Sequence, residues 1–329
     1  MEKSKLKRKK MQYLDFEHTL MEVDTNIEAL KITQSQRGLD IAAEMERLTT
    51  KRERVLRQTY KNLTPWQKSC VARHEARPHT RDYLRTIFTD FFPLRGDRLF
   101  AEDAAITGGL AKLNGQTVMV IGHEKGHDTD SRLAHNFGMA RPEGYRKAER
   151  LMHLAEQFGI PVITLIDTAG AYPGVDAEER GQARAIATTI EAGLNLRVPL
   201  IACIIGEGGS GGAIALATGN SILMMENAIY SVISPEGCAS ILWKDFKYAP
   251  QAAEILHLTA QDLSEKGLID EIIAEPVGAA HHFPDQAMQA VGTALSHHVK
   301  KWADIPADEL IRTRQDKFLA MTRAGEIKK

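Results

Sequence analysis

The chain has 329 residues, 43% of them hydrophobic, and a formal net charge of -1. A chain of this length favours a globular protein with one large domain or two small ones. Its nearly neutral charge argues against a protein that binds nucleic acids or membrane surfaces. The longest uncharged stretch, residues 208–225, is rich in Gly, Ser, Thr and Asn, so we predict no transmembrane helix. The basic start leads into acidic residues instead of an apolar run, which argues against a signal peptide and favours a cytoplasmic protein.

Cysteine usage and the basic start add two narrower expectations. Cys70, Cys203 and Cys238 are far apart and form no CxxC pair, so we predict reduced thiols packed in the core and neither a disulfide nor a metal set. Basic residues crowd positions 3–10. We interpret them as a solvated tail, with a phosphate-binding arm as the alternative.

The N-terminal part is predicted to be helical. Apolar residues recur at helical spacing over residues 15–60, which indicates two amphipathic helices separated by a polar break at 34–38. Thr64 and Pro65 then fit the N-cap and first position of a short third helix that ends before Pro78.

The main body begins with a predicted hairpin. Residues 105–113 and 116–122 are strand-like, and Asn114-Gly115 between them favours a type I′ turn. The apolar spacing of residues 143–158 then predicts a helix, because Gly159 and Pro161 follow as stop signals.

A unit of strand, glycine turn and helix follows twice. The two copies run through residues 162–166, 168–174 and 177–193, and through residues 198–205, 206–212 and 211–217. Both strands are continuously apolar, as in a sheet covered on both faces, so we predict an α/β fold. Further strands are expected at 221–225 and 228–232, a helix start at 234–236, and mostly helix over 249–273 and beyond Pro276.

The second glycine turn, residues 206–212, has five glycines among seven residues and matches three patterns. Gly206, Gly208 and Gly211 satisfy the dinucleotide pattern G-x-G-x-x-G, with Glu226 at the distance of a ribose-binding carboxylate. Such a unit usually opens its domain, whereas here the turn with Tyr172 precedes it. This order along the chain argues against the dinucleotide interpretation.

The same turn also fits a nucleophile elbow. Gly208, Ser210 and Gly212 satisfy G-x-S-x-G, and His257 with Asp245 or Asp262 would complete a triad. His257 lies in an apolar helical stretch, where a packed structural histidine is the more common case. A phosphate-binding Walker A loop is excluded, because no Lys-Ser or Lys-Thr follows the glycines.

The third interpretation uses the backbone of the glycine turn. N–H groups at a strand end, followed directly by a helix N-terminus, can stabilise an oxyanion. One good donor contributes about 3–4 kcal/mol to a transition state. The alternative is a loop that is rich in glycine only to pack tightly.

Several segments together resemble the carboxyltransferase alpha subunit of bacterial acetyl-CoA carboxylase. The resemblance runs from roughly Phe16 to Pro284, and Ala169 departs from it where the family usually has proline. The basic extension before Met11 is also longer than the family requires. The matching segments are residues 136–139, 142–148, 166–174 (IDTAGAYPG), 178–182 (EERGQ), 205–212 (IGEGGSGG) and 230–243 (YSVISPEGCASILW).

The resemblance implies a crotonase-like (ClpP/crotonase) fold of repeated strand, strand and helix units with an N-terminal helical region. It implies transfer of a carboxyl group from carboxybiotin, carried by a separate protein, to acetyl-CoA. The product is malonyl-CoA, in the first committed step of fatty acid synthesis by an ATP-dependent complex. Two oxyanion holes serve this reaction, the alpha subunit belongs to the biotin side, and the departing biotin acts as the base.

Site residues follow from the resemblance, position by position. The N–H groups of Gly208 and Gly209 would form the biotin oxyanion hole, with Gly211 and Gly212 shaping the helix start. Tyr172 either lines the biotin pocket or is an ordinary core aromatic. The further substrate-binding positions are Ala169 and Gly170. Arg141, Arg146 and Lys147 would meet a partner or CoA, or else be solvated.

The resemblance also implies partners. These are a carboxyltransferase beta subunit in an α2β2 assembly, the biotin carboxyl carrier protein and biotin carboxylase. Zinc is expected in the beta subunit and no metal in this chain, which should be nearly inactive alone. A regulatory protein on the same fold and a serine hydrolase using Ser210 remain the alternatives.

Three segments are expected in all. The tail and N-terminal helices occupy residues 1–78, with the family's module beginning near residue 40. The carboxyltransferase domain occupies 79–298 and a peripheral helical segment 299–329.

Overall fold

The structure, a computed structural model, describes residues 12–37 and 41–323. The chain divides into two compact units, one up to Leu63 and one from Thr64 onward. The basic stretch at 3–10 and a module start near residue 40 lie outside the described residues. The predicted segment limits at 78 and 298 remain predictions.

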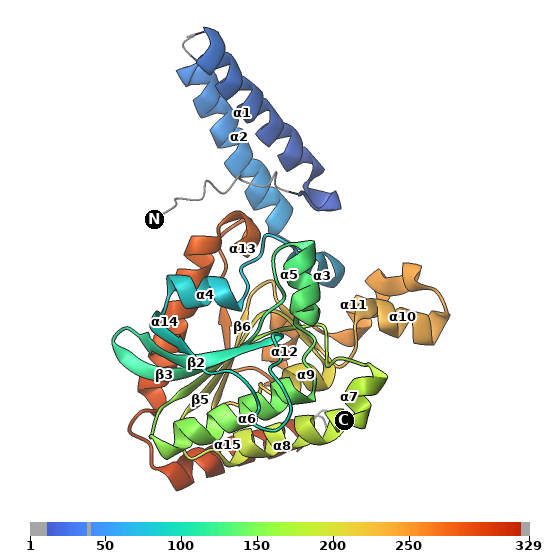
Figure 1. The fold of residues 1–329 in the computed structure, drawn as a ribbon. Helices are drawn as coiled ribbons and strands as arrows, with labels where there is room; N and C mark the ends of the chain where they lie inside the picture. Colours follow the sequence, from blue (N-terminus) through green and yellow to red (C-terminus); the bar gives the residue numbers. More distant parts are fainter. Residues whose placement is uncertain (1–11, 38–40, 324–329) are drawn as a thin grey trace. The chain divides into compact units, whose positions relative to one another are not determined.

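The first unit is a pair of helices. After a 3-10 turn, η1 (Asp15–Glu17), the chain forms α1 (His18–Arg37) and α2 (Ala42–Tyr60), as predicted (Figure 1). Helix α1 continues through Arg37, so it passes the start of the predicted break at 34–38. Within this unit the Tyr60 hydroxyl donates to Glu17 Oε1 at 2.6 Å, and Arg52 Nε donates to Asp24 Oδ1 at 2.5 Å.

A mixed sheet organises the second unit. Strands β3, β4, β5, β6 and β8 run parallel in that order, while β1 and β2 extend the β3 edge in antiparallel fashion and β7 pairs with the far end of β5. The bounds are β1 (Thr89–Pro93), β2 (Ile106–Leu113), β3 (Gln116–His123), β4 (Val162–Thr168), β5 (Leu200–Gly209), β6 (Ser221–Met225), β7 (Ile229–Ser231) and β8 (Glu271–Ile273). The predicted α/β class is confirmed.

Helices cover both faces of this sheet (Figure 1). A methyl group on Gly108 would meet Leu151 of α6, and one on Gly122, which points to the opposite face, would meet Thr80 of α4. The helices of this unit are α3 (Pro65–Ala72), α4 (Thr80–Thr86), α5 (Thr129–Ala134), η2 (Asn136–Gly138), α6 (Pro142–Gln157), α7 (Val175–Glu179), α8 (Gln182–Asn195), α9 (Ser210–Ile214), α10 (Pro235–Trp243), η3 (Phe246–Tyr248), α11 (Ala249–Leu256), α12 (Ala260–Glu265), α13 (Ala279–His282), α14 (Pro284–Trp302) and α15 (Ala307–Arg323).

Local turn and cap signals are confirmed. Asn114 and Gly115 have φ of 49° and 83°, as a type I′ turn requires. Thr64 caps α3 by accepting a hydrogen bond from the Gln67 N–H at 3.2 Å, and Ser234 caps α10 by accepting one from the Gly237 N–H at 3.0 Å.

Element ends differ from the prediction at several places. Strand β5 continues through Gly209, and the helix that follows is only α9 (Ser210–Ile214). The helix predicted at 177–193 is interrupted at Gly181, whose φ is 80°. Strand β8 lies inside the stretch 249–273, which was predicted to be mostly helical.

One smaller expectation is wrong. Only Cys203 is buried, whereas Cys70 and Cys238 are partly exposed. The C-terminal segment, whose predicted peripheral position stays a prediction, is anchored by Arg314 of α15, which is fully buried. Its guanidinium donates to the carbonyl oxygens of Gly193 at 2.9 Å and Leu196 at 2.8 Å, at the end of α8.

Candidate functional site

The two predicted turns lie side by side where β4 and β5 end. Thr168 is the register partner of Gly208, and because the strands are parallel both chains leave the sheet at the same edge. A methyl group on Gly209 would overlap the carbonyl oxygen of Ala169, and one on Gly212 would come 2.7 Å from the carbonyl carbon of Gly170. The structure therefore brings the backbones of the two turns into contact.

The glycines of the second turn have different surroundings. Gly208 and Gly209 are still part of β5, paired with Tyr230 and Ser231 of β7, so the bend comes later than predicted. The first N–H groups of a helix have no partner within it. Here that helix is α9, which begins at Ser210.

Gly211 is the most open of these glycines. A methyl group there would meet only Ile186, at ordinary contact distances of 3.6 and 3.7 Å. At Gly208, by contrast, it would lie 2.9 Å from the ring of Tyr230. Gly211 therefore has room for a methyl group beside Ile186 at the start of α9.

A serine triad is not assembled. Ser210 has a φ of 50°, as a strained elbow would, but no hydrogen bond joins it to a histidine within the part of the chain that the structure describes. His257 is not packed in a helix interior as predicted. It ends α11 with a φ of 49°, its side chain is 57% exposed, and it lies 3.7 Å from Asp262. Asp245 instead caps η3 through the Lys247 N–H, at 3.0 Å.

Glu226, the carboxylate that the dinucleotide interpretation requires, is already used within the fold. Glu226 Oε2 accepts a hydrogen bond from the N–H of Glu275 at 3.1 Å, which ties it to the segment after β8. Its position along the sequence matches a ribose-binding residue, but its side chain serves the fold.

A set of buried charges lies next to the ends of β4 and β5. Lys125 Nζ lies 2.9 Å from Asp167 Oδ1 and 2.6 Å from Glu207 Oε1. Arg73 Nε lies 2.7 Å from Glu207 Oε2, and His79 Nδ1 lies 3.0 Å from Asp167 Oδ2. We call these residues, Arg73, His79, Lys125, Asp167 and Glu207, the strand-end charge network.

Opposite charges keep the two carboxylates of this network ionised. Burial alone would raise the pKa of Asp167, but Lys125 and His79 outweigh it and hold that pKa well below its ordinary range. Burial acts against Glu207 in the same way, and Lys125 with Arg73 keeps its pKa low. Nearby His123 has no comparable partner, so burial lowers its pKa to about 4 and leaves the ring neutral at pH 7.

Sequence reasoning did not find this network. Asp167 and Glu207 each follow a continuously apolar strand, and a charge at such a place needs a buried partner. That signal was present. The sequence did not show which residues these partners are, because Lys125 and Arg73 come from distant loops and helices.

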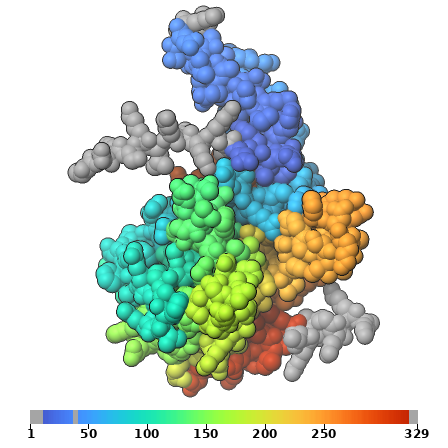
Figure 2. All heavy atoms as spheres, turned by 45° about the vertical axis from the view of Figure 1, so that its right-hand side comes forward, coloured from blue at the N-terminus to red at the C-terminus, as the bar shows by residue number. Residues whose placement is uncertain are grey.

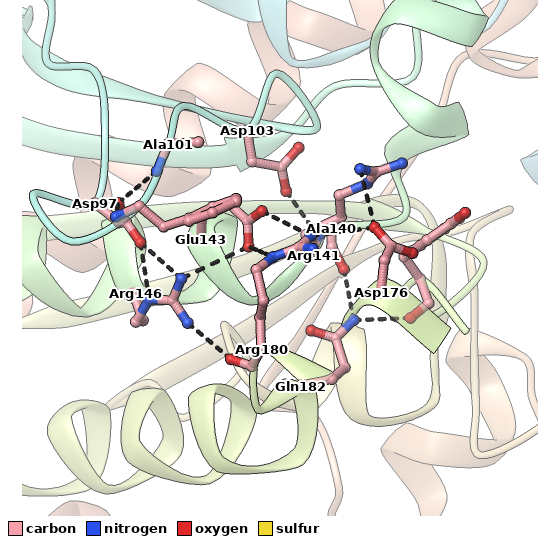
Figure 3. A network of polar contacts seen from close by, with 12 residues as sticks. Asp97, Ala101, Asp103, Ala140, Arg141, Glu143, Arg146, Asp176, Arg180 and Gln182 are labelled. Atoms are coloured by element: carbon pink, nitrogen blue, oxygen red, sulfur yellow. Dashed lines mark hydrogen bonds and ion pairs between the residues drawn. The ribbon is translucent and has the colours of Figure 1, made fainter. Parts of the chain in front are cut away.

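A second polar network holds the first turn (Figure 3). The Tyr172 N–H donates to Ala140 O at 3.0 Å, and Gln182 Nε2 donates to the carbonyl oxygens of both residues at 2.9 Å. The Arg141 guanidinium lies 4.6 Å from the centre of the Tyr172 ring and 3.3 Å from Asp176. Tyr172 is partly exposed, so it is not an ordinary core aromatic.

Two cations expected to be solvated, or to meet CoA, are used inside the fold. Arg146 Nη2 lies 2.8 Å from Asp97 (Figure 3). Lys147 is buried, and its Nζ lies 2.6 Å from Glu102 and 2.7 Å from the carbonyl oxygen of Asp103. Of the three candidates, Arg141 alone keeps substantial exposure.

Solved structures with similar folds identify the fold of the second unit. The transcarboxylase 12S core, described with methylmalonyl-coenzyme A bound, has a TM-score of 0.55 at 18% identity, over 68% of this chain and 42% of that chain. The beta subunit of geranyl-CoA carboxylase from P. aeruginosa has a TM-score of 0.53 at 18% identity, over 74% of this chain and 46% of that one. The predicted crotonase-like carboxyltransferase fold is confirmed.

Sequence comparison gives the family. Residues 13–322 match the family described as acetyl co-enzyme A carboxylase carboxyltransferase-like. The chain is 58% identical over 315 residues to the acetyl-coenzyme A carboxylase carboxyl transferase subunit alpha of Paramagnetospirillum magneticum, covering 96% of this chain and 99% of the relative. The chain belongs to the family of carboxyltransferase alpha subunits of acetyl-CoA carboxylase, and so to fatty acid biosynthesis.

Family membership confirms two further expectations at a coarse level. The protein is a subunit of a biotin-dependent carboxylase and of a multi-subunit complex. No helix among the described residues is both long and apolar enough to cross a membrane.

Proposed function

We propose that this chain forms the biotin side of the carboxyltransferase site. The carboxyl group leaves carboxybiotin on a separate carrier protein and is added to acetyl-CoA, giving malonyl-CoA. The observation that carries this proposal is the meeting of two strand-end turns directly before the start of α9, where Gly209 and Gly212 pack against the first turn while Gly211 keeps room at the helix start. Such a site holds charge with main-chain groups and needs no nucleophile.

The oxyanion hole is assigned to the glycine end of β5. The N–H groups of Gly208 and Gly209 stabilise the charge that develops on the biotin ureido oxygen, and Gly211 and Gly212 shape the helix start beside it. Each good donor contributes about 3–4 kcal/mol to the transition state. Ala169, Gly170 and Tyr172 form the adjoining wall, and the departing biotin takes the proton from acetyl-CoA.

The rest of the site is proposed to come from other proteins in the cytoplasm. These are a carboxyltransferase beta subunit, which holds the zinc and completes an α2β2 assembly, the biotin carboxyl carrier protein and biotin carboxylase. Exposed apolar side chains support a partner surface on the lobe formed by α10, η3 and α11 (orange in Figure 2). Ile241 is 62% exposed there and Phe246 is 73% exposed.

Reconstitution tests the proposal. The purified chain is combined with the beta subunit, and malonyl-CoA decarboxylation is measured with free biotin as acceptor. We expect almost no turnover by the chain alone and clear turnover by the pair. Full activity of the isolated chain, or an inactive pair, would contradict the divided site.

Ser210→Ala separates this mechanism from that of a serine hydrolase. Main-chain donors survive this change, so we expect turnover to stay within about threefold of the unsubstituted enzyme. Loss of a true nucleophile typically costs about 10⁶-fold in kcat. A loss of that order in the reconstituted assay would overturn the backbone mechanism.

A further inference from the structure

Buried side chains hold the end of β5 one residue after another. Arg77 Nε donates to the carbonyl oxygen of Ile205 at 2.7 Å, and the N–H of Glu207 donates to Asp167 Oδ1 at 3.1 Å. Between them, a methyl group on Gly206 would overlap the Asp167 carboxylate. The strand is therefore fixed to this carboxylate directly before Gly208.

Lys125 joins the two carboxylates at this point. Its ammonium lies 2.9 Å from Asp167 Oδ1, the same oxygen that accepts the Glu207 N–H, and 2.6 Å from Glu207 Oε1. The three side chains are 13%, 3% and 10% exposed, respectively. One ammonium thus neutralises two nearly dry carboxylates and links the side chain of Glu207 to the residue that binds its backbone.

The two arginines nearby also form ion pairs with other carboxylates. Arg73 shares its guanidinium between Glu207 and Glu236, each at 2.7 Å. Arg77 is paired with Glu275 at 2.7 Å.

Histidine offers no replacement for the bridge. His79 Nδ1 contacts the far oxygen of Asp167, and the His79 ring lies 4.9 Å from the His127 ring between centroids, tilted by 47°. His123 is neutral at pH 7 because burial lowers its pKa. Among the described residues, Lys125 is the cation that contacts both carboxylates.

We propose that Lys125 is a positioning residue of the carboxyltransferase, setting the place of the Gly208 and Gly209 amides by bridging Asp167 and Glu207. The inference rests on the proposed oxyanion hole. Lys125 contacts no reacting atom in this account, and its effect reaches the site through the two carboxylates and the backbone of β5.

Lys125→Met in the assembled enzyme tests the bridge. A displacement of about 1 Å in reacting groups can cost about 10²-fold, so we expect kcat to fall by about that factor. The KM for malonyl-CoA should change less than about threefold, because binding of CoA does not depend on the biotin hole. Lys125→Arg should recover much of kcat, since a guanidinium can also bridge two carboxylates.

The pH dependence of Lys125→Met distinguishes the loss of a charge from the loss of packing. Without Lys125, burial and mutual repulsion raise the pKa of one carboxyl group toward neutrality. Lowering the pH from about 8 to about 6 should therefore restore part of the activity of Lys125→Met relative to the unsubstituted enzyme. Removing one carboxylate charge in Lys125→Met/Glu207→Gln should raise kcat at least about tenfold over the single variant.

The matched control is Lys112→Met. Lys112 pairs with Asp90 at 2.9 Å on an exposed part of the sheet edge, so its removal should change neither turnover nor the pH profile. Unchanged kcat in Lys125→Met would overturn the proposal. So would a loss that neither low pH nor the second substitution relieves.

Thermal unfolding of the isolated chain separates this proposal from the proposed function. The midpoint should fall in Lys125→Met and rise again at lower pH and in the double variant, whether or not the enzyme turns over. If the reconstituted enzyme is inactive while this pattern appears, the bridge stands and the assignment of the reaction fails. If the pattern is absent, the bridge itself is wrong.

Discussion

Among the glycines of the second turn, Gly211 is the one at which a methyl group fits without a clash. It lies at the start of α9, where a methyl group would make only ordinary contacts with Ile186. The other glycines of the turn are surrounded more closely, so their substitution disturbs the strand and the adjacent turn. Gly211 therefore offers the cleanest single-residue test of bare backbone at this site.

We predict that Gly211→Ala keeps the fold but impairs the reaction. A methyl group beside Ile186 would narrow the space that we propose for biotin at the helix start, and losing one oxyanion donor costs about 10²–10³-fold in kcat. We expect a loss toward the lower end of that range in the reconstituted decarboxylation assay, with a melting temperature close to that of the unsubstituted chain.

Gly209→Ala is the contrasting variant. Its methyl group would overlap the carbonyl oxygen of Ala169, so we expect a clear drop in melting temperature as well as in turnover. If Gly211→Ala shows full turnover, a bulky ligand does not lie against the helix start.

Residue-level prediction succeeded where local chemistry was sufficient. The sequence predicted a glycine turn after each of two apolar strands, and the structure brings the two turns together where β4 and β5 end. It did not predict that Gly209 and Gly212 pack against the first turn. The partners of Asp167 were not predictable in this way, because Lys125 lies in a loop after β3 with no periodicity to show where its side chain points. Arg146 and Lys147 lie on a helix that was predicted, but they were misjudged because their carboxylate partners, Asp97 and Glu102, come from a distant loop.

At the scale of elements, strand ends were harder to predict than strand cores. The apolar run of β5 ends at Ile205, but backbone pairing continues to Gly209 because β7 supplies a partner that a single strand pattern cannot reveal. Strand β8 has only three residues and gains its extended form from pairing with β6. Both errors arise from tertiary pairing that overrides local propensity.

Helix α15 gives a prediction about stability. Arg314 satisfies carbonyl groups at the end of α8 and also donates to Val198 O at 3.1 Å. Hydrogen bonds to a charged group contribute about 1.5–3 kcal/mol each, and buried acceptors would be left unpaired. We expect Arg314→Met to lower the free energy of unfolding by about 3 kcal/mol, measured by urea denaturation.

Arg312 provides the control on the same helix. Its side chain is exposed, so Arg312→Met should leave the unfolding midpoint nearly unchanged. An equal effect of the two substitutions would mean that α15 contributes through general helix properties and not through the buried guanidinium.

At the scale of the whole molecule, α10 and η3 carry exposed apolar side chains, which we interpret as a surface that binds a partner. Large apolar patches on a protein surface mark sites of interaction. We predict that Ile241→Asp combined with Phe246→Asp weakens binding to the beta subunit at least about tenfold, because burying an unpaired carboxylate in an interface is costly. Sedimentation of the mixed subunits would measure this.

Phe158→Asp is the corresponding control. Phe158 follows α6 and is 70% exposed, so it tests whether any added surface charge weakens assembly. Equal weakening by both changes would argue against the lobe as the partner surface. The sequence could not predict this surface, since helical periodicity shows which residues are apolar but not what covers them.

The central claim is that main-chain amides at the end of β5 hold the charge that forms on biotin. A crystal structure of the chain with its beta subunit and bound biotin tests it most directly. The account predicts the ureido oxygen within hydrogen-bonding distance, about 3 Å, of the N–H groups of Gly208 and Gly209. A ureido oxygen bound elsewhere, with these amides facing only the protein, would contradict it.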